Sequence, residues 1–529
     1  MESALGSTLE LNHLALLQHR ALTRGHTTLF KLPKPGSTDE WVDVTVAEFA
    51  ADVERVACAL LIDLQAKEIP PRSVIAMLID GRPYHHFLYS IALSRLGYVP
   101  EMIPPRLLDK SIISELMQNA EAKAIVYDSS LVSSIADYTL PAIAIMPMND
   151  IAYDSSSLPR IEDLPCDADV CFIYLTSGST SAGSPKLVPV TQKFVAAAYK
   201  AEVDIFQRNK FDTQDVFLSR GSINSITVLM LYLSCLTMGS CIVYPSGESV
   251  TTQDLFTLVD VCGLNRMAMV GTFFFPHIQA AKRDRATLQL LQRMRSISYG
   301  GVALPIVEDD WCFQNGVHLV DVYAMTECGI LMASVPGKPS RYVRPIPTVS
   351  CRFDPVSKTI DESESTELFE LIVLPDSPRL PHPQLLAADG TFHSGDLFER
   401  MSDGSYVFRG RNDDWIKTKS AYWCDTKSIE EKVRETCGDL VERCIVVGSF
   451  RPIPALFIEP HSASTLSDDS LKETILTRMH EFNIRRYRLI FIVDQGVLPR
   501  TVPNSRRSLR RAAIERQFSA ILDEVYGEL

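Results

Sequence analysis

The sequence predicts an α/β protein with a large N-terminal α/β domain and a smaller α+β domain after it. Short apolar runs that suit buried strands alternate with helix-like stretches over most of the first four hundred residues, which is typical of parallel sheets covered by helices. Beyond residue 412 the elements become smaller in scale, and 529 residues are too many for one compact core. We therefore expect domains at residues 1–412 and 413–529.

Local patterns predict the elements of the large domain. A helix should begin after Thr45, because Glu48 three residues on completes a capping box, and another should cover residues 191–203. Apolar runs predict short buried strands at residues 74–79, 124–127, 170–175, 267–270 and 319–323.

Residues 226–245 are almost uncharged and come close to the roughly 20 residues that cross a bilayer. Gly239 interrupts this stretch, and the strand-like residues after it end at Pro245. We expect a buried helix, a glycine break and a buried strand, and therefore no membrane span.

In the smaller domain, a helix should begin at Ser428, where Glu431 completes a cap, and end before Gly438. A second helix is expected at residues 471–482. Strands are expected at residues 444–448, 455–459 and 489–493.

Composition limits the classes of function. Hydrophobic residues make up 46% and charged residues 22%, as in ordinary folded proteins, and the net charge of −13 disfavours nucleic acid as a partner. The twelve cysteines form no CxxC pair, and residues 1–10 carry no secretory signal. With no peroxisomal tripeptide at the end, we expect reduced thiols and a cytoplasmic location.

A loop rich in hydroxyls and glycines follows the strand predicted at residues 170–175. It runs from Thr176 to Lys186 and lacks the Walker pattern. Glycines let backbone N–H groups turn toward an anion, hydroxyls add donors and the lysine adds a charge, which together suit nucleotide phosphates. A flexible surface linker is the alternative interpretation.

Two further segments carry groups that suit a nucleotide. Tyr323, Thr326 and Glu327 end a predicted strand with a ring, a hydroxyl and a carboxylate, which can stack on a base, contact a phosphate and hold Mg²⁺. Glu327 alone would more often be a solvated loop carboxylate. Asp396 follows a tight turn, where it can accept both hydroxyls of a ribose, and Arg411 lies near the domain boundary.

The order and spacing of these segments resemble the adenylate-forming (AMP-binding) enzyme superfamily, which includes acyl- and aryl-CoA ligases and adenylation domains of nonribosomal peptide synthetases. The family's TSG[ST]TGxPK is matched at residues 176–186 with two residues inserted, YGxTE at 323–327 and TGD at 394–396. GRxDDxIK is matched in full at residues 410–417, and 415–430 look most like the fungal synthetase-like branch.

This resemblance implies an activity. In the family, a carboxylate attacks the α-phosphate of ATP to give an acyl-AMP and pyrophosphate, and a thiol, of CoA or a phosphopantetheine carrier, usually displaces AMP after the small, mobile domain rotates. Thr326 would bind the α-phosphate, Glu327 would hold Mg²⁺, and Asp413 would be the hinge. The residues that would contact ATP are Thr176, Ser177, Gly178, Ser179, Thr180, Gly183 and Lys186 at the phosphates, Gly300, Gly301 and Tyr323 at adenine, and Asp396 and Arg411 at ribose.

Two positions depart from the family pattern. A catalytic lysine usually follows LPxTxxG near the C-terminal end; here an ungapped match puts Ser505 in its place and a one-residue slip puts Arg506 there. We expect Arg506 to supply the charge, although its broad, forked head differs from a lysine, and a solvated basic helix is the alternative. Ser420 stands where a glycine of the thioester-forming site is expected. The efficiency of adenylation and the acceptor therefore remain open.

The acyl group should be recognised by residues 221–227 and 271–276. Residues 218–225 offer no acid to pair with an α-ammonium, which disfavours an α-amino acid. Phe273, Phe274 and Phe275 suit an aryl or aliphatic acid, unless they only pack in the core.

The sequence thus predicts an ATP- and Mg²⁺-dependent ligase of secondary metabolism that transfers a non-amino carboxylic acid to CoA or to a carrier on a separate chain, since no carrier segment follows residue 529. One alternative is a free-standing adenylation enzyme that passes its acyl-AMP to an amine. The other is a degenerate member that binds nucleotide without catalysis.

Overall fold

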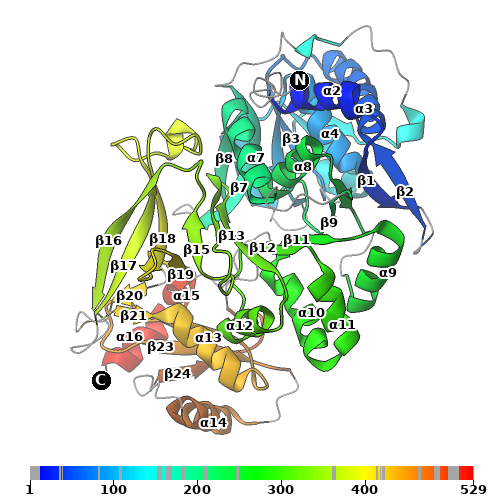
Figure 1. Cartoon of the computed structure of the whole chain (residues 1–529). Coiled ribbons are helices and arrows are strands. Elements are labelled where there is room, and N and C mark those ends of the chain that lie inside the picture. Colours follow the sequence, from blue (N-terminus) through cyan, green and yellow to red (C-terminus); the bar gives the residue numbers. More distant parts are fainter. Residues whose placement is uncertain are drawn as a thin grey trace. The chain divides into compact units, whose positions relative to one another are not determined.

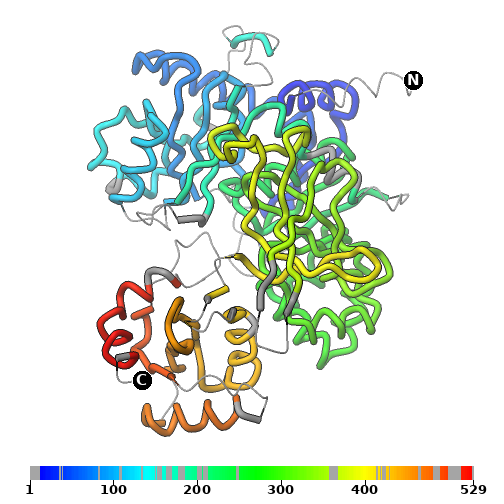
Figure 2. The backbone as a smooth tube through the Cα atoms, turned by 90° about the vertical axis from the view of Figure 1, so that its left-hand side faces the viewer, coloured from blue at the N-terminus to red at the C-terminus, as the bar shows by residue number. Residues whose placement is uncertain are grey.

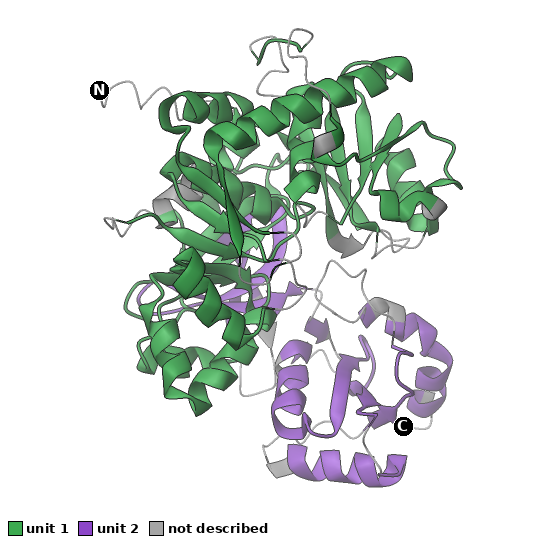
Figure 3. Cartoon of the chain, turned by 90° about the vertical axis from the view of Figure 1, so that its right-hand side faces the viewer, with its two compact units in different colours: residues 1–351, 373–392 green, residues 352–372, 393–529 purple. Residues whose placement is uncertain are grey.

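The computed structural model describes residues 12–34, 37, 40–80, 84–105, 110–151, 158–161, 169–179, 185–206, 213–245, 250–359, 365–412, 415–417, 419, 423–462, 466–481, 489–498 and 511–527. The chain divides into two compact units (Figure 3). Unit 1 comprises residues 1–351 and 373–392, and unit 2 comprises residues 352–372 and 393–529. The domain boundary at residue 412 stays a prediction.

Unit 1 contains a large mixed sheet in which β10, β9, β11, β12 and β13 are parallel neighbours (Figure 1). The strand order within unit 1 is β15-β14-β13-β12-β11-β9-β10-β1-β2. The bounds are β1 Thr28–Pro33, β2 Trp41–Thr45, β9 Val216–Ser219, β10 Cys241–Val243, β11 Arg266–Val270, β12 Ser296–Gly300, β13 Leu319–Met325, β14 Gly329–Ser334 and β15 Val343–Pro345.

A second sheet of unit 1 has the order β6-β5-β3-β4-β7-β8 and is parallel except for the β7–β8 hairpin. Its strands are β3 Val74–Leu78, β4 Val99–Ile103, β5 Ala124–Tyr127, β6 Ala142–Ala144, β7 Val170–Ser179 and β8 Pro185–Thr191. The helices of unit 1 are α2 His13–Arg24, α3 Val46–Ala66, α4 Tyr84–Arg95, α5 Lys110–Asn119, α6 Val132–Ile135, α7 Gln192–Phe206, α8 Ile226–Met238, α9 Thr252–Cys262, α10 Gly271–Arg283, α11 Arg285–Arg293 and α12 Ile306–Gln314.

The main hydrophobic core of unit 1 joins the two sheets through a layer of helices. Residues of α2, α3, α4, α7 and α8 pack there with residues of both sheets, and Phe30, Phe49, Phe87 and Tyr232 form a cluster of rings. The predicted capping box of Thr45 and Glu48 opens α3 and is confirmed.

The expected buried helix, glycine break and strand at residues 226–245 are also confirmed. Gly239 ends α8 in the left-handed conformation at φ +76°, and β10 follows. Among the described residues, no helix has the length and apolar character needed to span a membrane.

Unit 2 contains the neighbouring strands β16 to β19 and a smaller α+β group, seen in orange and red in Figure 2. Its strands are β16 Cys351–Thr359, β17 Ser365–Val373, β18 Phe392–Arg400, β19 Tyr406–Arg411, β20 Trp415–Lys417, β21 Trp423–Asp425, β22 Val441–Val447, β23 Ala455–Pro460 and β24 Leu489–Ile492. Its helices are α13 Thr426–Cys437, α14 Asp468–Glu481, α15 Arg511–Gln517 and α16 Ser519–Gly527.

The expected start of α13 at Ser428 is wrong. The helix begins at Thr426, directly after β21, and the side chain of Thr426 is fully buried. Because this first turn packs inside the unit, tertiary packing places the helix start earlier than the local pattern of Ser428 and Glu431 indicates.

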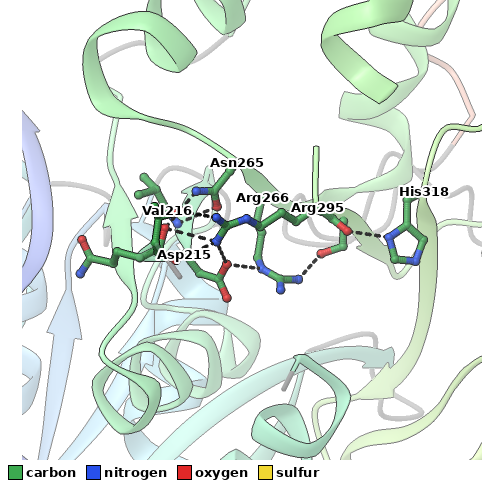
Figure 4. A network of polar contacts seen from close by, with 9 residues as sticks. Asp215, Val216, Asn265, Arg266, Arg295 and His318 are labelled. Carbon is green, nitrogen blue, oxygen red and sulfur yellow. Dashed lines mark hydrogen bonds and ion pairs between the residues drawn. The ribbon is translucent and has the colours of Figure 1, made fainter. Parts of the chain in front are cut away.

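A buried ionic network ties the amino-terminal ends of the parallel strands β9, β11 and β12 together (Figure 4). Asp215 precedes β9, and its Oδ1 lies 3.0 Å from Nε of Arg266 and 2.5 Å from Nη1 of Arg295. Arg266, which is 2% exposed, also donates to Oγ of Ser296 at 2.7 Å. His318 donates to the carbonyl oxygen of Arg295 at 2.6 Å, so four consecutive strand starts are connected.

Replacing Asp215 by alanine should therefore destabilise unit 1. The change leaves the buried guanidinium of Arg266 without its carboxylate, which costs about 3–5 kcal/mol of unfolding free energy. Chemical denaturation would measure the loss. The control is Glu40→Ala, which removes an exposed pair with Lys34 and should cost less than about 1 kcal/mol. Equal losses in the two variants would contradict the assigned role of Asp215.

A buried acidic side chain lies on β4. Glu101 is fully buried, and neither carboxylate oxygen has a hydrogen-bond partner among the described residues. Burial raises the pKa of Glu101 from 4.5 to about 8. The folded protein thus holds a proton that the unfolded chain releases above pH 4.5, so the contribution of Glu101 to stability falls as the pH rises toward 8.

Glu101→Gln should remove this pH dependence. We expect the melting temperature of the variant, relative to the wild type, to rise progressively between pH 5 and pH 8.5, because glutamine stays neutral. Differential scanning fluorimetry over this range tests the expectation, with the exposed Glu40→Gln as control. Parallel pH profiles for the wild type and Glu101→Gln would contradict it.

Candidate functional site

The carboxyl ends of four strands meet at one edge of the first sheet of unit 1. Strand β9 pairs in parallel with β11, β11 with β12, and β12 with β13. The residues that follow or end these strands therefore lie along one edge, which in α/β proteins is where ligands bind. This edge brings together both expected acyl segments, at 221–227 and 271–276, with Gly300, Gly301 and Tyr323.

The glycine segment at the end of β12 allows a close approach to β13. A Cβ atom on Gly300 would lie 2.7 Å from the carbonyl oxygen of Val322, and Gly301 has φ +78°. Tyr323 on β13 is partly exposed, and a register shift follows it before Ala324. Glycine backbone beside a partly exposed aromatic ring suits stacking of an adenine base.

The short turn between β13 and β14 carries the expected phosphate and metal groups. Thr326, Glu327 and Cys328 form this turn, and Thr326 and Glu327 are both partly exposed. Among the described residues, the carboxylate of Glu327 has no ion-pair partner. A partly exposed carboxylate of this kind fits Mg²⁺, which prefers oxygen ligands and retains several waters.

Arg379 lies beside this turn, although no sequence pattern pointed to it. The guanidinium is fully buried and donates from Nη2 to the carbonyl oxygen of Ala198 on α7 at 2.9 Å. A Cβ atom on Gly329, which follows the turn at φ +66°, would lie 3.1 Å from Nη1 of Arg379 and 3.6 Å from Phe194. Arg379 thus lies between Gly329, at the end of the Glu327 turn, and α7, the helix that directly follows β8.

The ends of the phosphate loop form a β-hairpin. Thr176 on β7 lies opposite Lys186 on β8, and Ser179 lies opposite Pro185. The backbone of Ser177 and Gly178 belongs to β7, so these positions are part of a sheet and not of a linker. Thr180 and Gly183 lie outside the described residues.

The two expected ribose residues lie together in unit 2. Asp396 on β18 is opposite Arg411 on β19, and its Oδ1 lies 3.2 Å from Nη1 of Arg411. Gly395 has φ +68°, and a Cβ atom there would lie 2.9 Å from Nη2 of Arg411. The ion pair thus requires the glycine beside it. Two further expected residues, Asp413 and Arg506, lie outside the described residues.

The three phenylalanines of α10 divide into two groups. Phe274 is fully buried in the core, whereas Phe273 and Phe275 are 47% and 37% exposed. The guanidinium of Arg220, at the end of β9, lies 4.7 Å from the ring centre of Phe273. The alternative that these phenylalanines only pack in the core therefore holds for Phe274 alone.

Hydrogen bonds join the other expected acyl segment, residues 221–227, to the residues that follow β3. Ser222 donates to the carbonyl oxygen of Asp80 at 2.8 Å, and Nδ2 of Asn224 donates to that of Ile79 at 2.9 Å. Oδ1 of Asn224 is buried and has no hydrogen-bond partner among the described residues. The segment thus connects the carboxyl edges of the two sheets.

Gly300→Ala should weaken binding of AMP, the nucleotide that the sequence resemblance implies. The added methyl group would press on the backbone of Val322 and displace β12 from β13, at a cost of about 1–3 kcal/mol, or roughly 5- to 150-fold in affinity. Isothermal titration calorimetry with AMP measures the change. In the control, Gly337→Ala adds a methyl group where nothing lies within 4 Å, at a positive φ of 79°; it should strain only the local backbone and leave the affinity unchanged. Normal AMP binding by Gly300→Ala would contradict the assignment.

The comparisons with known proteins cover most of the chain. The family model described as AMP-binding enzyme matches residues 17–359, and that of the AMP-binding enzyme C-terminal domain matches residues 413–529. The AMP-binding domain-containing enzyme iboA of Amanita muscaria is 53% identical over 517 residues, which cover 93% of this chain and 99% of the relative. Anthranilate–CoA ligase of Pseudomonas aeruginosa is 25% identical, with 74% and 78% covered.

Solved structures share the fold at low sequence identity. The o-succinylbenzoate CoA synthetase of Bacillus subtilis, in complex with its acyl-adenylate, superposes with a TM-score of 0.73 at 17% identity, covering 94% of this chain and 97% of that one. The amide bond synthetase McbA of Marinactinospora thermotolerans superposes at 0.69 and 17% identity, covering 96% and 99%. With two thirds of its length matched by the family model and a relative above half identity, this chain belongs to the adenylate-forming, AMP-binding enzyme family.

Proposed function

We propose that this enzyme activates a non-amino carboxylic acid, aryl or aliphatic, as its acyl-AMP and then transfers the acyl group to the thiol of CoA or of a separate carrier protein. The observation that carries the proposal is the shared carboxyl edge of β9, β11, β12 and β13. Gly300, Gly301, Tyr323 and both segments expected to recognise the acyl group lie along this edge. Membership of the family supports the acyl-AMP step.

The proposed first step is an in-line displacement at phosphorus. A carboxylate oxygen of the acid forms a bond to the α-phosphorus of ATP, the bond to the bridging oxygen breaks, and pyrophosphate leaves. Lys186 would neutralise charge on the leaving phosphates, and the Thr326 hydroxyl would donate to the α-phosphate. When bound at Glu327, Mg²⁺ would neutralise further phosphate charge.

In the proposed second step, a thiolate sulfur attacks the acyl carbon, the bond between that carbon and the phosphate oxygen breaks, and AMP leaves. The choice between CoA and a carrier falls on residues around Ser420, which lie outside the described part of the chain.

Transfer to an amine is the second candidate. It is favoured by the serine at position 420 in place of the glycine that suits thioester formation.

Aromatic acids are the first substrates to test. Phe273 and Phe275 expose their rings on the first turns of α10, beside the carboxyl edge, and such rings bind aryl groups by stacking or edge contacts. The names of anthranilate–CoA ligase and o-succinylbenzoate CoA synthetase point to the same class of acid. Secondary metabolism and a cytoplasmic location remain part of the proposal.

ATP–pyrophosphate exchange over a panel of aryl, aliphatic and α-amino acids tests the proposal. Exchange should depend on an aryl or aliphatic acid, and Lys186→Ala should lower kcat/KM by about 10²–10³-fold through lost charge neutralisation. The matched control is Lys193→Ala, which removes an exposed lysine of α7 and should leave exchange unchanged. Exchange supported only by α-amino acids would contradict the substrate class.

The same assay tests the altered C-terminal segment. If Arg506 supplies the missing lysine's charge, Arg506→Ala should reduce exchange strongly, and Arg506→Lys should restore much of it. AMP binding without exchange on any acid would instead favour the degenerate member. Exchange that proceeds to a hydroxamate with hydroxylamine, but to no CoA thioester, would favour the carrier or amine route.

A further inference from the structure

A group of three metal-ligating side chains lies at the carboxyl edge of the second sheet of unit 1. His85 and His86 belong to the first turn of α4, which follows β3, and Asp128 directly follows β5. Strands β3 and β5 are parallel neighbours, with Leu78 opposite Tyr127. Their carboxyl ends therefore coincide, and residues more than forty positions apart in sequence come together there.

The ligand atoms of the three residues converge. Nε2 of His86 lies 2.7 Å from Oδ2 of Asp128, and Nε2 of His85 lies 4.0 Å from the same oxygen. All three ligand atoms lie within 4.8 Å of one another. In a tetrahedral zinc site with bonds of about 2.0–2.2 Å, neighbouring ligand atoms are roughly 3.3–3.5 Å apart. One of the two measured distances is shorter than this value and the other is longer. Small side-chain rotations would therefore bring the three atoms into a tetrahedral arrangement.

The contacts around the group orient one ligand and leave the group open to solvent on one side. Oδ1 of Asp128 accepts a hydrogen bond from the backbone N–H of Ser130 at 2.8 Å, which orients the carboxylate and directs Oδ2 toward the imidazoles. Side chains of His85 and Asp128 are 40% and 23% exposed, whereas His86 is 1% exposed. A cation can thus reach the group from solvent, and the buried His86 provides a fixed ligand.

The protonation states suit metal binding. Burial lowers the pKa of His86 to about 4 and also lowers the pKa of His85. Burial opposes the charge on Asp128, but hydrogen bonds from Ser130 and His86 hold the pKa of Asp128 at about 2. These directions favour neutral imidazoles and an ionised carboxylate, the forms in which these side chains ligate.

We infer that His85, His86 and Asp128 form a binding site for a zinc-class divalent cation, distinct from the magnesium site assigned to Glu327. Two imidazole nitrogens and one carboxylate oxygen favour Zn²⁺ or Co²⁺ over Mg²⁺ and Ca²⁺, which prefer oxygen ligands alone. Three protein ligands leave a fourth position open for water. The bound cation would tie the start of α4 to the end of β5.

The site also adjoins a segment expected to contact substrate. Asp80, which follows the end of β3, acts electrostatically on His86. The carbonyl oxygen of the same Asp80 accepts the hydrogen bond from Ser222 in the acyl segment. A cation at the histidines would therefore stiffen the chain on which that segment rests.

Titration of the metal-free full-length protein with Zn²⁺ in a calorimeter, and with Co²⁺ followed by visible absorption, tests the inference without ATP or an acid. The wild type should bind one ion and give the intense ligand-field bands of tetrahedral Co²⁺, and Zn²⁺ should raise its melting temperature. His85→Ala, whose side chain is partly exposed and so should fold, should lower the affinity by about 100-fold or more and abolish the bands. Asp128→Asn should do the same.

His26→Ala is the matched control, because His26 is exposed and lies outside the group; it should bind the ion like the wild type. Mg²⁺ in place of Zn²⁺ should give no stabilisation through this site. Two results would overturn the inference: no stoichiometric binding to the wild type, or equal binding by the wild type, His85→Ala and Asp128→Asn. In the second case the ion binds elsewhere, and His86 and Asp128 are only a hydrogen-bonded pair.

Discussion

One partly buried carboxylate, that of Asp215, holds together the starts of the strands that carry the residues expected to bind nucleotide in unit 1. Asp215 neutralises the guanidinium groups of Arg266 and Arg295 at the starts of three parallel strands (Figure 4). These strands pair in register from their amino-terminal ends. The network at those ends therefore also sets where the carboxyl ends lie. Ion pairs and hydrogen bonds stabilise the amino edge of the sheet. The carboxyl edge consists of glycines and loops, which can bind ligands.

The site depends next on close backbone packing. Gly300 lets β12 run against β13, and Gly329 lets the turn that carries Glu327 approach Arg379 and α7. The strand edge and the hairpin of β7 and β8 lie in unit 1, and the ion pair of Asp396 and Arg411 lies in unit 2.

Local patterns predict a large part of this architecture. The capping box at Thr45, the break at Gly239 and the short apolar strands all depend on neighbouring residues, and these elements lie close to where the sequence puts them. The family resemblance likewise implies that Thr176 and Lys186 act together, as do Asp396 and Arg411, and the structure pairs both sets. The division of the strands into two sheets is not encoded locally, nor is the earlier start of α13 at Thr426, which depends on burial of that side chain.

Long-range partners were the least predictable part of the site. Arg379 lies in a loop without any recognisable pattern, fifty residues beyond the turn that it lies beside, and only the folded chain brings it to Ala198. The same limit applies to Asp128 and the histidines of α4, which come from separate elements. Sequence spacing identifies groups with a chemical use, whereas three-dimensional packing decides which of them meet.

The composition of helix α8 affects how this enzyme is inactivated by heat. Eleven of its 13 residues are buried, and the helix carries no charged side chain. When unit 1 unfolds, this hydrophobic helix becomes exposed. It can then associate with another unfolded molecule before the chain refolds. Inactivation by heat should therefore become irreversible as the protein concentration rises, so the working lifetime of the enzyme is set by the rate of opening and not by equilibrium stability.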